Sequence, residues 1–191
     1  MQASSWDSPF RVQQAARAVW RGGIVAYPTE GVYGLGCLPQ ARQTVERLLA
    51  IKRRSWRKGL AIIGADLAQL EPLVIMPQGP LRAEILSSWP GPVTWALEAR
   101  AGVPSWLSGG RNTLAVRVTD HPLARRLCLQ AGSPLVSTSA NRSGHPPCTR
   151  ALQVRREFGG ELDYVLAGAL GGLTRPTTVR DGLTGAVLRE P

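Results

Sequence analysis

Residues 24–36 read IVAYPTEGVYGLG, and this stretch is the clearest indication of how the chain folds. The apolar run Ile24–Tyr27 predicts a buried strand that ends at Pro28, since proline lacks the amide hydrogen that a sheet ladder needs. The glycine-rich residues up to Gly36 predict a turn whose backbone N–H groups can approach a ligand. The same residues also suit an ordinary glycine-rich turn, so a ligand site is one of two interpretations.

Outward from this stretch, helical and strand-like patterns follow one another without strict alternation. Helices are expected over residues 9–20, 40–51, 66–73, 79–88, 120–130 and 150–158, and strands over 60–64, 93–97, 113–118, 134–137, 163–167, 177–180 and 186–189. Ser8 and Asp120 are the expected helix caps. This order predicts an α/β or α+β fold with a mixed sheet. No repeat or linker interrupts it, so residues 1–191 are expected to form a single domain.

The charge of the chain is strongly positive, with a net charge of +10 and a pI near 10.9. Residues 41–60 and residues 111–160 each carry a net +6. Such blocks predict polyanionic partners such as nucleotides or RNA. No apolar run is long enough for a membrane helix, the first residues have no secretory pattern, and the three cysteines lack zinc-ligand spacing. We therefore expect a cytoplasmic protein with inert thiols and no membrane partner.

Four polar segments at predicted strand ends are candidate binding loops. The first contains Thr29, and the second is the basic loop with Lys52, Arg54 and Lys58, where alternate side chains can converge on a triphosphate. The third brings Thr94 to a strand start, and the fourth is the small polar run Ser137–Gly144. Each has a structural alternative: a tight turn, a solvated helix end, a rigid Pro-Gly-Pro turn and a helix-capping loop.

Several familiar site types are missing from the sequence. There is no P-loop, dinucleotide fingerprint, zinc-protease motif or nucleophile elbow. His121 lies near a predicted helix start, where a lone histidine is more often structural. Trp56 lies inside the basic loop, and it is the tryptophan placed to stack on a base.

Five segments, in order, resemble the YrdC/TsaC family of threonylcarbamoyl-AMP synthases. They are residues 24–30 with 32–36, Lys52-x-Arg54 with Lys58, residues 89–94, residues 115–122, and residues 137–144. Each motif alone is weak, but five in order are highly specific and span nearly the whole chain. The length is similar to the short, single-domain type. At Gly31, Ser55 and Gly59 the sequence departs from residues common in the family.

The resemblance implies a YrdC-like fold, a twisted mixed sheet flanked by helices with a basic concave cleft. It also implies a nucleotidyltransferase that joins L-threonine, bicarbonate and ATP into threonylcarbamoyl-AMP and pyrophosphate. The product would pass to the tRNA threonylcarbamoyl transferase machinery. Magnesium is expected to be held mainly by substrate phosphates, because the chain has only 13 carboxylates and no acidic cluster.

The resemblance also carries roles onto particular residues. Lys52 and Arg54 would be catalytic and, with Lys58, would bind the ATP phosphates. The ATP and threonine pocket would be lined by Thr29, Thr94 and Arg117, with Arg117 available for the amino acid's carboxylate. Ser139 and Asn141 would hold the nucleotide, and Arg189 would close over the phosphates. Because Lys52 and Arg54 occupy a polar loop, replacing either with alanine is expected to abolish activity with little effect on unfolding.

Two other functions fit the same composition. A basic concave surface could bind double-stranded RNA or tRNA by backbone charge, as a ribosome-maturation or tRNA-chaperone module without turnover. A regulatory ATP-binding domain is the third interpretation. The small polar run after residue 136 favours the synthase, because a binder of phosphate backbones has no need of it.

Overall fold

The computed structural model describes residues 8–173 and 177–190. Its helices are α1 (Pro9–Trp20), α2 (Arg42–Ile51), α3 (Leu67–Leu70), α4 (Pro80–Ser87), α5 (Ser105–Ser108), α6 (Pro122–Gln130) and α7 (Ala151–Phe158), with short 3-10 turns η1 (Trp56–Lys58) and η2 (Gly159–Glu161). Its strands are β1 (Val25–Pro28), β2 (Tyr33–Gly36), β3 (Ala61–Gly64), β4 (Val74–Ile75), β5 (Val93–Ala99), β6 (Thr113–Val118), β7 (Leu135–Ser139), β8 (Tyr164–Val165), β9 (Thr178–Asp181) and β10 (Val187–Arg189).

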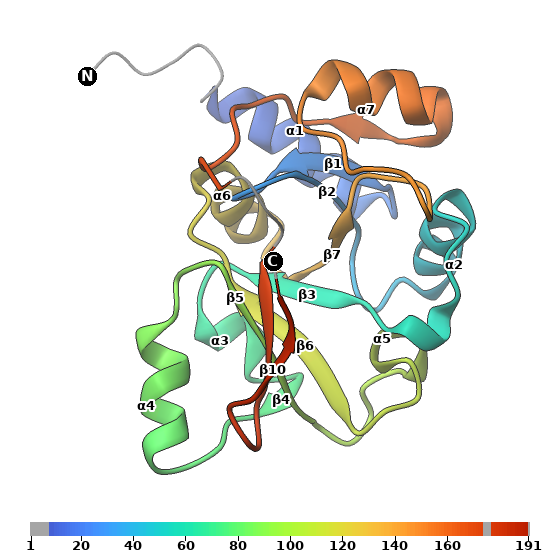
Figure 1. The fold of residues 1–191 in the computed structure, drawn as a ribbon. Helices are drawn as coiled ribbons and strands as arrows, with labels where there is room; N and C mark the ends of the chain where they lie inside the picture. Colours follow the sequence, from blue (N-terminus) through green and yellow to red (C-terminus); the bar gives the residue numbers. More distant parts are fainter. Residues whose placement is uncertain (1–7, 174–176, 191) are drawn as a thin grey trace.

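The strands form one twisted sheet in the order β10-β9-β5-β6-β3-β7-β2-β1-β8, and β4 pairs with β5 (Figure 1). Three neighbouring pairs are parallel, namely β1 with β8, β3 with β6, and β5 with β9. The others are antiparallel. The predicted mixed sheet is therefore confirmed. Since strands distant in sequence are neighbours, the sheet brings the separate polar loops within reach of one another.

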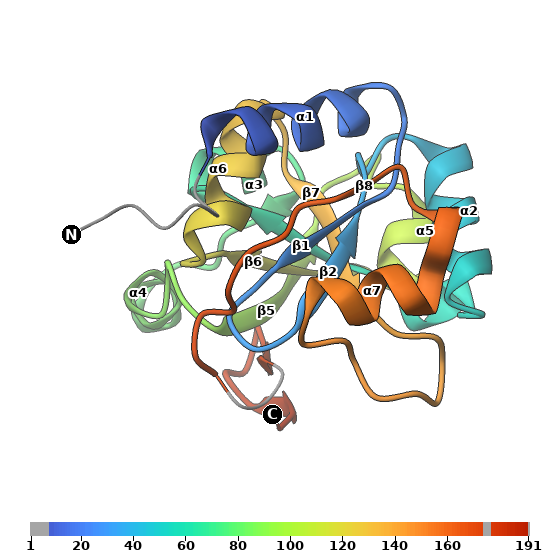
Figure 2. The same ribbon diagram turned by 90° about the horizontal axis from the view of Figure 1, so that it is seen from above.

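Helices cover both faces of the central strands. Viewed from above, α1 and α6 lie on one side of β1, β2 and β7, and α7 lies on the other (Figure 2). On the first side, Val12, Ala15 and Val19 of α1 are fully buried in one apolar cluster with Leu127 of α6. Helical spacing puts these residues of α1 on one stripe, as the sequence predicted. A second, larger cluster fills the opposite side, with Trp95 and Phe158 among its members.

The stretch that indicated the fold differs from expectation in one respect. The predicted turn after Pro28 is shorter, because Tyr33–Gly36 is strand β2, paired with both β1 and β7. A Cβ at Gly36 would lie 2.3 Å from the Val136 carbonyl and 2.9 Å from the Tyr27 hydroxyl. This glycine therefore permits close packing of strands, and its proposed part in a ligand-binding turn is wrong.

Other differences are local. His121, rather than Asp120, caps α6, since its ring nitrogen Nδ1 accepts the Ala124 N–H. Ser8 begins α1 without a side-chain cap bond. The short elements β4 and α5 were not predicted, because two to four residues carry too little periodicity. Within the described ranges no helix is long and apolar enough to cross a bilayer.

Candidate active site

Lys52 follows the last residue of α2, and its side chain is only 3% exposed. Its ammonium donates to the backbone carbonyls of Ser139 and Asn141, the latter at 2.7 Å, and to Asn141 Oδ1 at 3.3 Å. Burial, assisted by the nearby Arg54 charge, lowers the pKa of Lys52 to about 8. This lysine therefore joins the basic loop to the small polar run after β7 as a buried cation.

The loop after β7 is held in shape by its own side chains. The Ala140 N–H donates to the Tyr33 carbonyl at 2.7 Å, which ends the ladder between β2 and β7. Ser139 Oγ then donates to Asn141 Oδ1 at 2.6 Å, and Asn141 Nδ2 donates to the His145 carbonyl at 2.7 Å. Ser139 and Asn141, both expected site residues, are thus brought together and fixed beside Lys52.

Arg54 extends this group toward the C-terminal strand. One of its terminal nitrogens donates to the Gly59 carbonyl at 2.9 Å, while its buried Nε–H has no partner among the described residues. Burial, together with the positive charge of Arg189, lowers the pKa of Arg54. Arg189 in turn donates to the Thr177 carbonyl at 3.1 Å, and the Thr177 hydroxyl lies 3.3 Å from that of Thr94. Hydrogen bonds therefore join Lys52 to Ser139 and Asn141, and Thr177 joins Arg189 to Thr94. Arg54 lies near enough to Lys52 and to Arg189 for their charges to interact.

A second polar group lies under the ends of β1 and β6. Arg117 forms a buried ion pair with Glu30 Oε1, and both side chains are less than a tenth exposed. The Thr119 hydroxyl and the Asp120 N–H also donate to that oxygen, at 2.7 and 3.1 Å. Burial alone would raise the pKa of Glu30, but the Arg117 charge and these donors hold it below its ordinary value. Glu30 Oε2 is buried, and no described residue pairs with it.

Glu30 lies within the first motif of the sequence, but no role was predicted for its carboxylate. A carboxylate at a strand end, in a chain with few carboxylates, was the available signal. Thr177 was missed altogether, because it stands in no recognisable motif. Thr29 is buried beside Glu30, and its hydroxyl donates to the Val32 carbonyl at 2.6 Å.

Two expectations about the basic loop need correction. The loop is not extended, since Arg53 adopts a left-handed conformation and residues 56–58 form a turn. Lys58 is exposed, and none of the contacts found in the described part of the chain joins its ammonium to Lys52 or Arg54. Lys52 is not a dispensable loop residue either, because it is buried and binds carbonyls 87 residues away. Its replacement is therefore expected to affect folding as well as activity.

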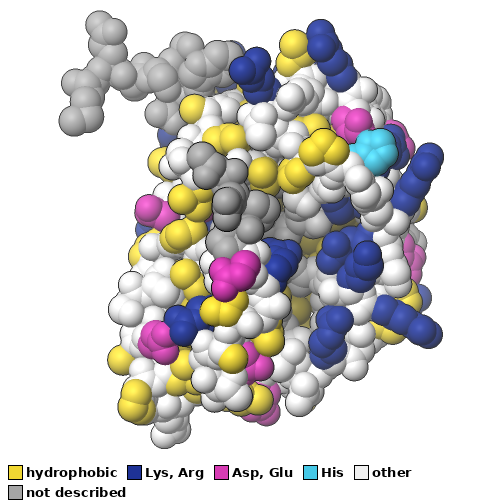
Figure 3. Space-filling model, viewed as in Figure 1, with side chains coloured by type: hydrophobic (Ala, Val, Ile, Leu, Met, Phe, Trp, Pro, Cys, Tyr) yellow, Lys and Arg dark blue, Asp and Glu magenta, His cyan; other side chains and the backbone are white. Residues whose placement is uncertain are grey.

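The surroundings of this group are strongly basic. Lys and Arg side chains gather on one side of the face that carries β10, beside a hollow in the molecular surface (Figure 3). The described residues contain no cluster of three His, Cys, Asp or Glu side chains that could hold a metal. The three cysteines are buried and free, and burial raises the pKa of the Cys37 thiol to about 12. The site thus offers cations, hydroxyls and amides.

Known proteins are similar to this chain in sequence and in fold. A family model named Sua5, YciO and YrdC, with the description "Telomere recombination", matches residues 17–190. A protein of Nitrosococcus oceani called threonylcarbamoyl-AMP synthase is 52% identical over 180 residues, 94% of this chain and 97% of that protein. A crystal structure of P. abyssi Sua5 complexed with L-threonine is 35% identical with a TM-score of 0.83, over 91% of this chain and 51% of that one.

The crystal structure of E. coli YciO also has a TM-score of 0.83, at 26% identity, and covers 96% of this chain and 91% of that chain. The likeness extends over nearly the full length of this chain in every case. The motif order read from the sequence, the mixed sheet and these similarities agree, and the chain belongs to the Sua5/YciO/YrdC family.

Proposed function

We propose that this protein is an L-threonylcarbamoyladenylate synthase. It would form threonylcarbamoyl-AMP, pyrophosphate and water from L-threonine, bicarbonate and ATP. The observation that carries the proposal is the gathering of three cations beside one polar loop. Lys52 binds the Ser139–Asn141 loop, Arg54 lies near enough to lower the pKa of Lys52, and Arg189 lies near enough to lower that of Arg54. Three cations beside hydroxyl and amide groups match a triphosphate. The name of the relative from Nitrosococcus oceani supports the same activity.

In this proposal the cations act by charge and position rather than as nucleophiles. The threonine amine attacks bicarbonate, and loss of water leaves a carbamate. A carbamate oxygen then attacks the α-phosphorus of ATP, and pyrophosphate leaves with the electrons of the broken P–O bond. Charge that collects on the phosphate oxygens is stabilised by fixed cations. Magnesium enters with ATP as part of the substrate.

The basic residues would divide this work. The three N–H groups of Lys52 already face oxygens of the Ser139–Asn141 loop, so Lys52 would position that loop and add its charge from beneath. The Nε–H of Arg54 has no partner within the described ranges, and Arg54 would contact a phosphate directly. Arg189, on the exposed strand β10, would close from the other side. Lys58 would reach only the outer phosphates.

The second polar group would bind threonine. Arg117 pairs with Glu30 through Nη1, which also donates to the Gly91 carbonyl, and the guanidinium would bind the carboxylate of threonine. Thr29 and Thr94, from the ends of β1 and β5, would complete the pocket. The structure of P. abyssi Sua5 complexed with L-threonine supports this choice of substrate. The product would pass to the tRNA threonylcarbamoyl transferase machinery, with direct tRNA contact at the basic cleft.

A comparison of two neighbouring arginines tests the proposal. Arg54→Gln should reduce threonine-dependent pyrophosphate release by about 100-fold or more, the typical effect of removing one transition-state donor. The matched control is Arg57→Gln, because Arg57 is exposed in the same loop. It should retain nearly full activity. Mass spectrometry for threonylcarbamoyl-AMP would identify the product. An Arg54→Gln protein with wild-type turnover, or a wild-type protein that binds RNA but releases no pyrophosphate, would contradict the proposed activity.

A further inference from the structure

Arg142 follows Asn141 in the polar run after β7, and its side chain reaches the ends of two helices. Nη1 donates to the Ile51 carbonyl at 2.8 Å, and Nη2 donates to the Glu157 carbonyl at 3.3 Å. Ile51 is the last residue of α2, and Glu157 is the last but one of α7. The last carbonyls of a helix have no partners within the helix and carry a partial negative charge. One guanidinium therefore stabilises the C-terminal ends of both helices.

Two carboxylates and an aromatic ring hold this guanidinium in place. Nε lies 3.4 Å from Glu157 Oε1, and Nη2 also pairs with Glu161 of η2. The guanidinium carbon lies 5.5 Å from the centroid of the Phe158 ring. The side chain of Arg142 is 23% exposed, so most of it is covered by the protein. A planar fork with five N–H donors can serve these acceptors together, whereas the ammonium of a lysine is a single point of charge.

The contacts of Arg142 reach the candidate active site through the backbone. Ile51 immediately precedes Lys52, and the Ser143 N–H donates to the Lys52 carbonyl at 2.9 Å. In the opposite direction, the Lys52 ammonium donates to the Asn141 carbonyl at 2.7 Å. The loop thus binds the carbonyls of residues 51 and 52, while the lysine that follows α2 binds the loop. The position of Lys52 relative to the loop is therefore fixed from both sides.

The backbone of Arg142 is constrained as well as its side chain. Its carbonyl accepts the Asn141 Nδ2–H at 3.1 Å and the His145 N–H at 3.0 Å. The same Asn141 amide places its Oδ1 3.3 Å from the Lys52 ammonium. A change in the Arg142 side chain would therefore be transmitted to Asn141 and Lys52, two residues of the candidate active site.

We propose that Arg142 is a positioning residue for the synthase reaction, because its fork sets where Lys52 and the Ser139–Asn141 loop lie relative to ATP. This inference rests on the proposed function. The donors of Arg142 already face protein oxygens, so it acts through its neighbours rather than on the substrate. Fixed charges are effective only where they are held, and a displacement of about 1 Å can lower a rate on the order of 100-fold. Threonine binding should change little, because Arg117 and Glu30 form a separate polar group.

Steady-state kinetics of Arg142→Met, with ATP and threonine varied in turn, test the proposal. Methionine keeps an unbranched stem against Phe158 but removes every N–H donor. We expect a lower kcat and a higher KM for ATP, so that kcat/KM for ATP falls by roughly 10–100-fold. KM for threonine should stay close to that of the wild type.

A merely structural role for Arg142 would give a different result. Loss of stability alone lowers the amount of active protein, and hence the apparent kcat, but it leaves both KM values unchanged. That pattern would overturn the proposal, and so would wild-type kinetics in Arg142→Met.

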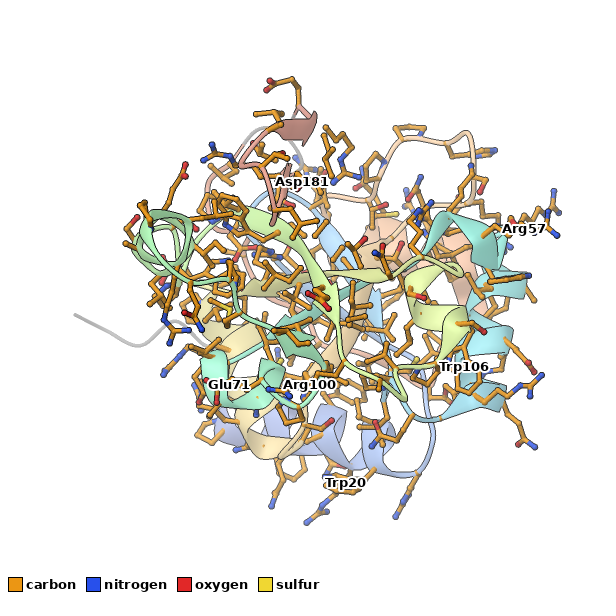
Figure 4. All side chains as sticks on the ribbon, turned by 90° about the horizontal axis from the view of Figure 1, so that it is seen from below. Trp20, Arg57, Glu71, Arg100, Trp106 and Asp181 are labelled. Carbon is orange, nitrogen blue, oxygen red and sulfur yellow. The ribbon has the colours of Figure 1, made fainter. Side chains whose placement is uncertain are left out.

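Arg100→Met is the matched control. The Nε–H of Arg100 donates at 2.7 Å to the carbonyl of Glu71, the residue after the end of α3, so this arginine also binds a helix end. Figure 4 shows Glu71 and Arg100 together, well away from Arg57 of the basic loop. The control loses a comparable hydrogen bond and should keep the kcat and both KM values of the wild type. Equal kinetic losses in the two variants would contradict a specific role for Arg142.

Arg142→Lys tests the planar fork, and it remains informative if Arg142→Met does not fold. Lysine keeps the positive charge, but one ammonium cannot serve the acceptors on α2, α7 and η2 together, so KM for ATP should still rise. Full restoration of the kinetics by lysine would refute the assigned fork. A wild-type protein without threonine-dependent pyrophosphate release would refute the proposed function and this inference with it. An active wild type beside an unaffected Arg142→Met variant would refute the positioning role alone.

Discussion

The stability of the protein should depend on pH through the buried ammonium of Lys52. The pKa of this group is about 8 in the folded chain, against an ordinary 10.5. At 1.36 kcal/mol per pKa unit, the difference corresponds to about 3 kcal/mol. Below pH 8 the lysine is charged in both states, and the folded state carries the whole penalty of desolvation. Between pH 8 and 10.5 the unfolded chain binds more protons, so the free energy of unfolding rises with pH.

A Lys52→Met variant isolates this contribution. Groups that do not interact with Lys52, such as Tyr27, are common to both proteins and cancel in the difference. Cys148, whose pKa the Lys52 charge lowers, is replaced by Ser in both proteins. The free energy of unfolding of the wild type, relative to that of Lys52→Met, should therefore increase by about 3 kcal/mol between about pH 7.5 and 10.5. The variant also loses hydrogen bonds to the Ser139 and Asn141 carbonyls, which lowers its stability by an amount that does not vary with pH.

Urea denaturation followed by tryptophan fluorescence, at pH intervals of about one unit, measures both curves. The slope of free energy against urea concentration serves as the control, because a constant slope shows that the same surface is exposed on unfolding. A difference between the two proteins that stays flat across this pH range would refute the reasoning. It would mean that Lys52 keeps an ordinary pKa despite its burial, and that solvent reaches the ammonium.

Three further outcomes are expected. Arg117→Met should lower the free energy of unfolding by about 3–5 kcal/mol, because it leaves the buried Glu30 carboxylate unpaired. The double variant Arg117→Met with Glu30→Gln should lose less stability than the two single variants combined. Strictly additive losses in urea denaturation would contradict the pairing. At subsaturating amino acid concentration, adenylate formation should favour threonine over serine by roughly 10–200-fold, and over valine by up to about 10⁴-fold. Equal use of valine and serine would exclude recognition of the substrate hydroxyl by Thr29 and Thr94. Chelation of magnesium with EDTA should stop pyrophosphate release. It should leave the unfolding midpoint unchanged, because the described residues contain no cluster that could hold a metal. A lowered midpoint would reveal a structural metal.

The sequence was sufficient for the family and for most of the secondary structure. Apolar runs such as residues 24–27 and 60–64 became buried strands, because burial of a continuous apolar segment depends little on its partners. The apolar stripe of α1 and the polar run after β7 were equally predictable from the sequence. The order of the five motifs pointed to the family that the comparisons then showed. Local pattern and motif order are properties of the chain itself, so they can be read without a fold.

Tertiary structure alone decided how the site residues are joined. Lys52 reaches the loop after β7 across 87 residues, and Glu30 and Arg117 meet because β1 and β6 lie in one sheet. No spacing in the sequence marks Lys52 as buried, since a lysine after a helix is ordinarily solvated. The same holds for Gly36, whose closeness to Val136 shows that it serves strand packing. Burial and pairing depend on which distant segments become neighbours, and only the folded sheet determines that.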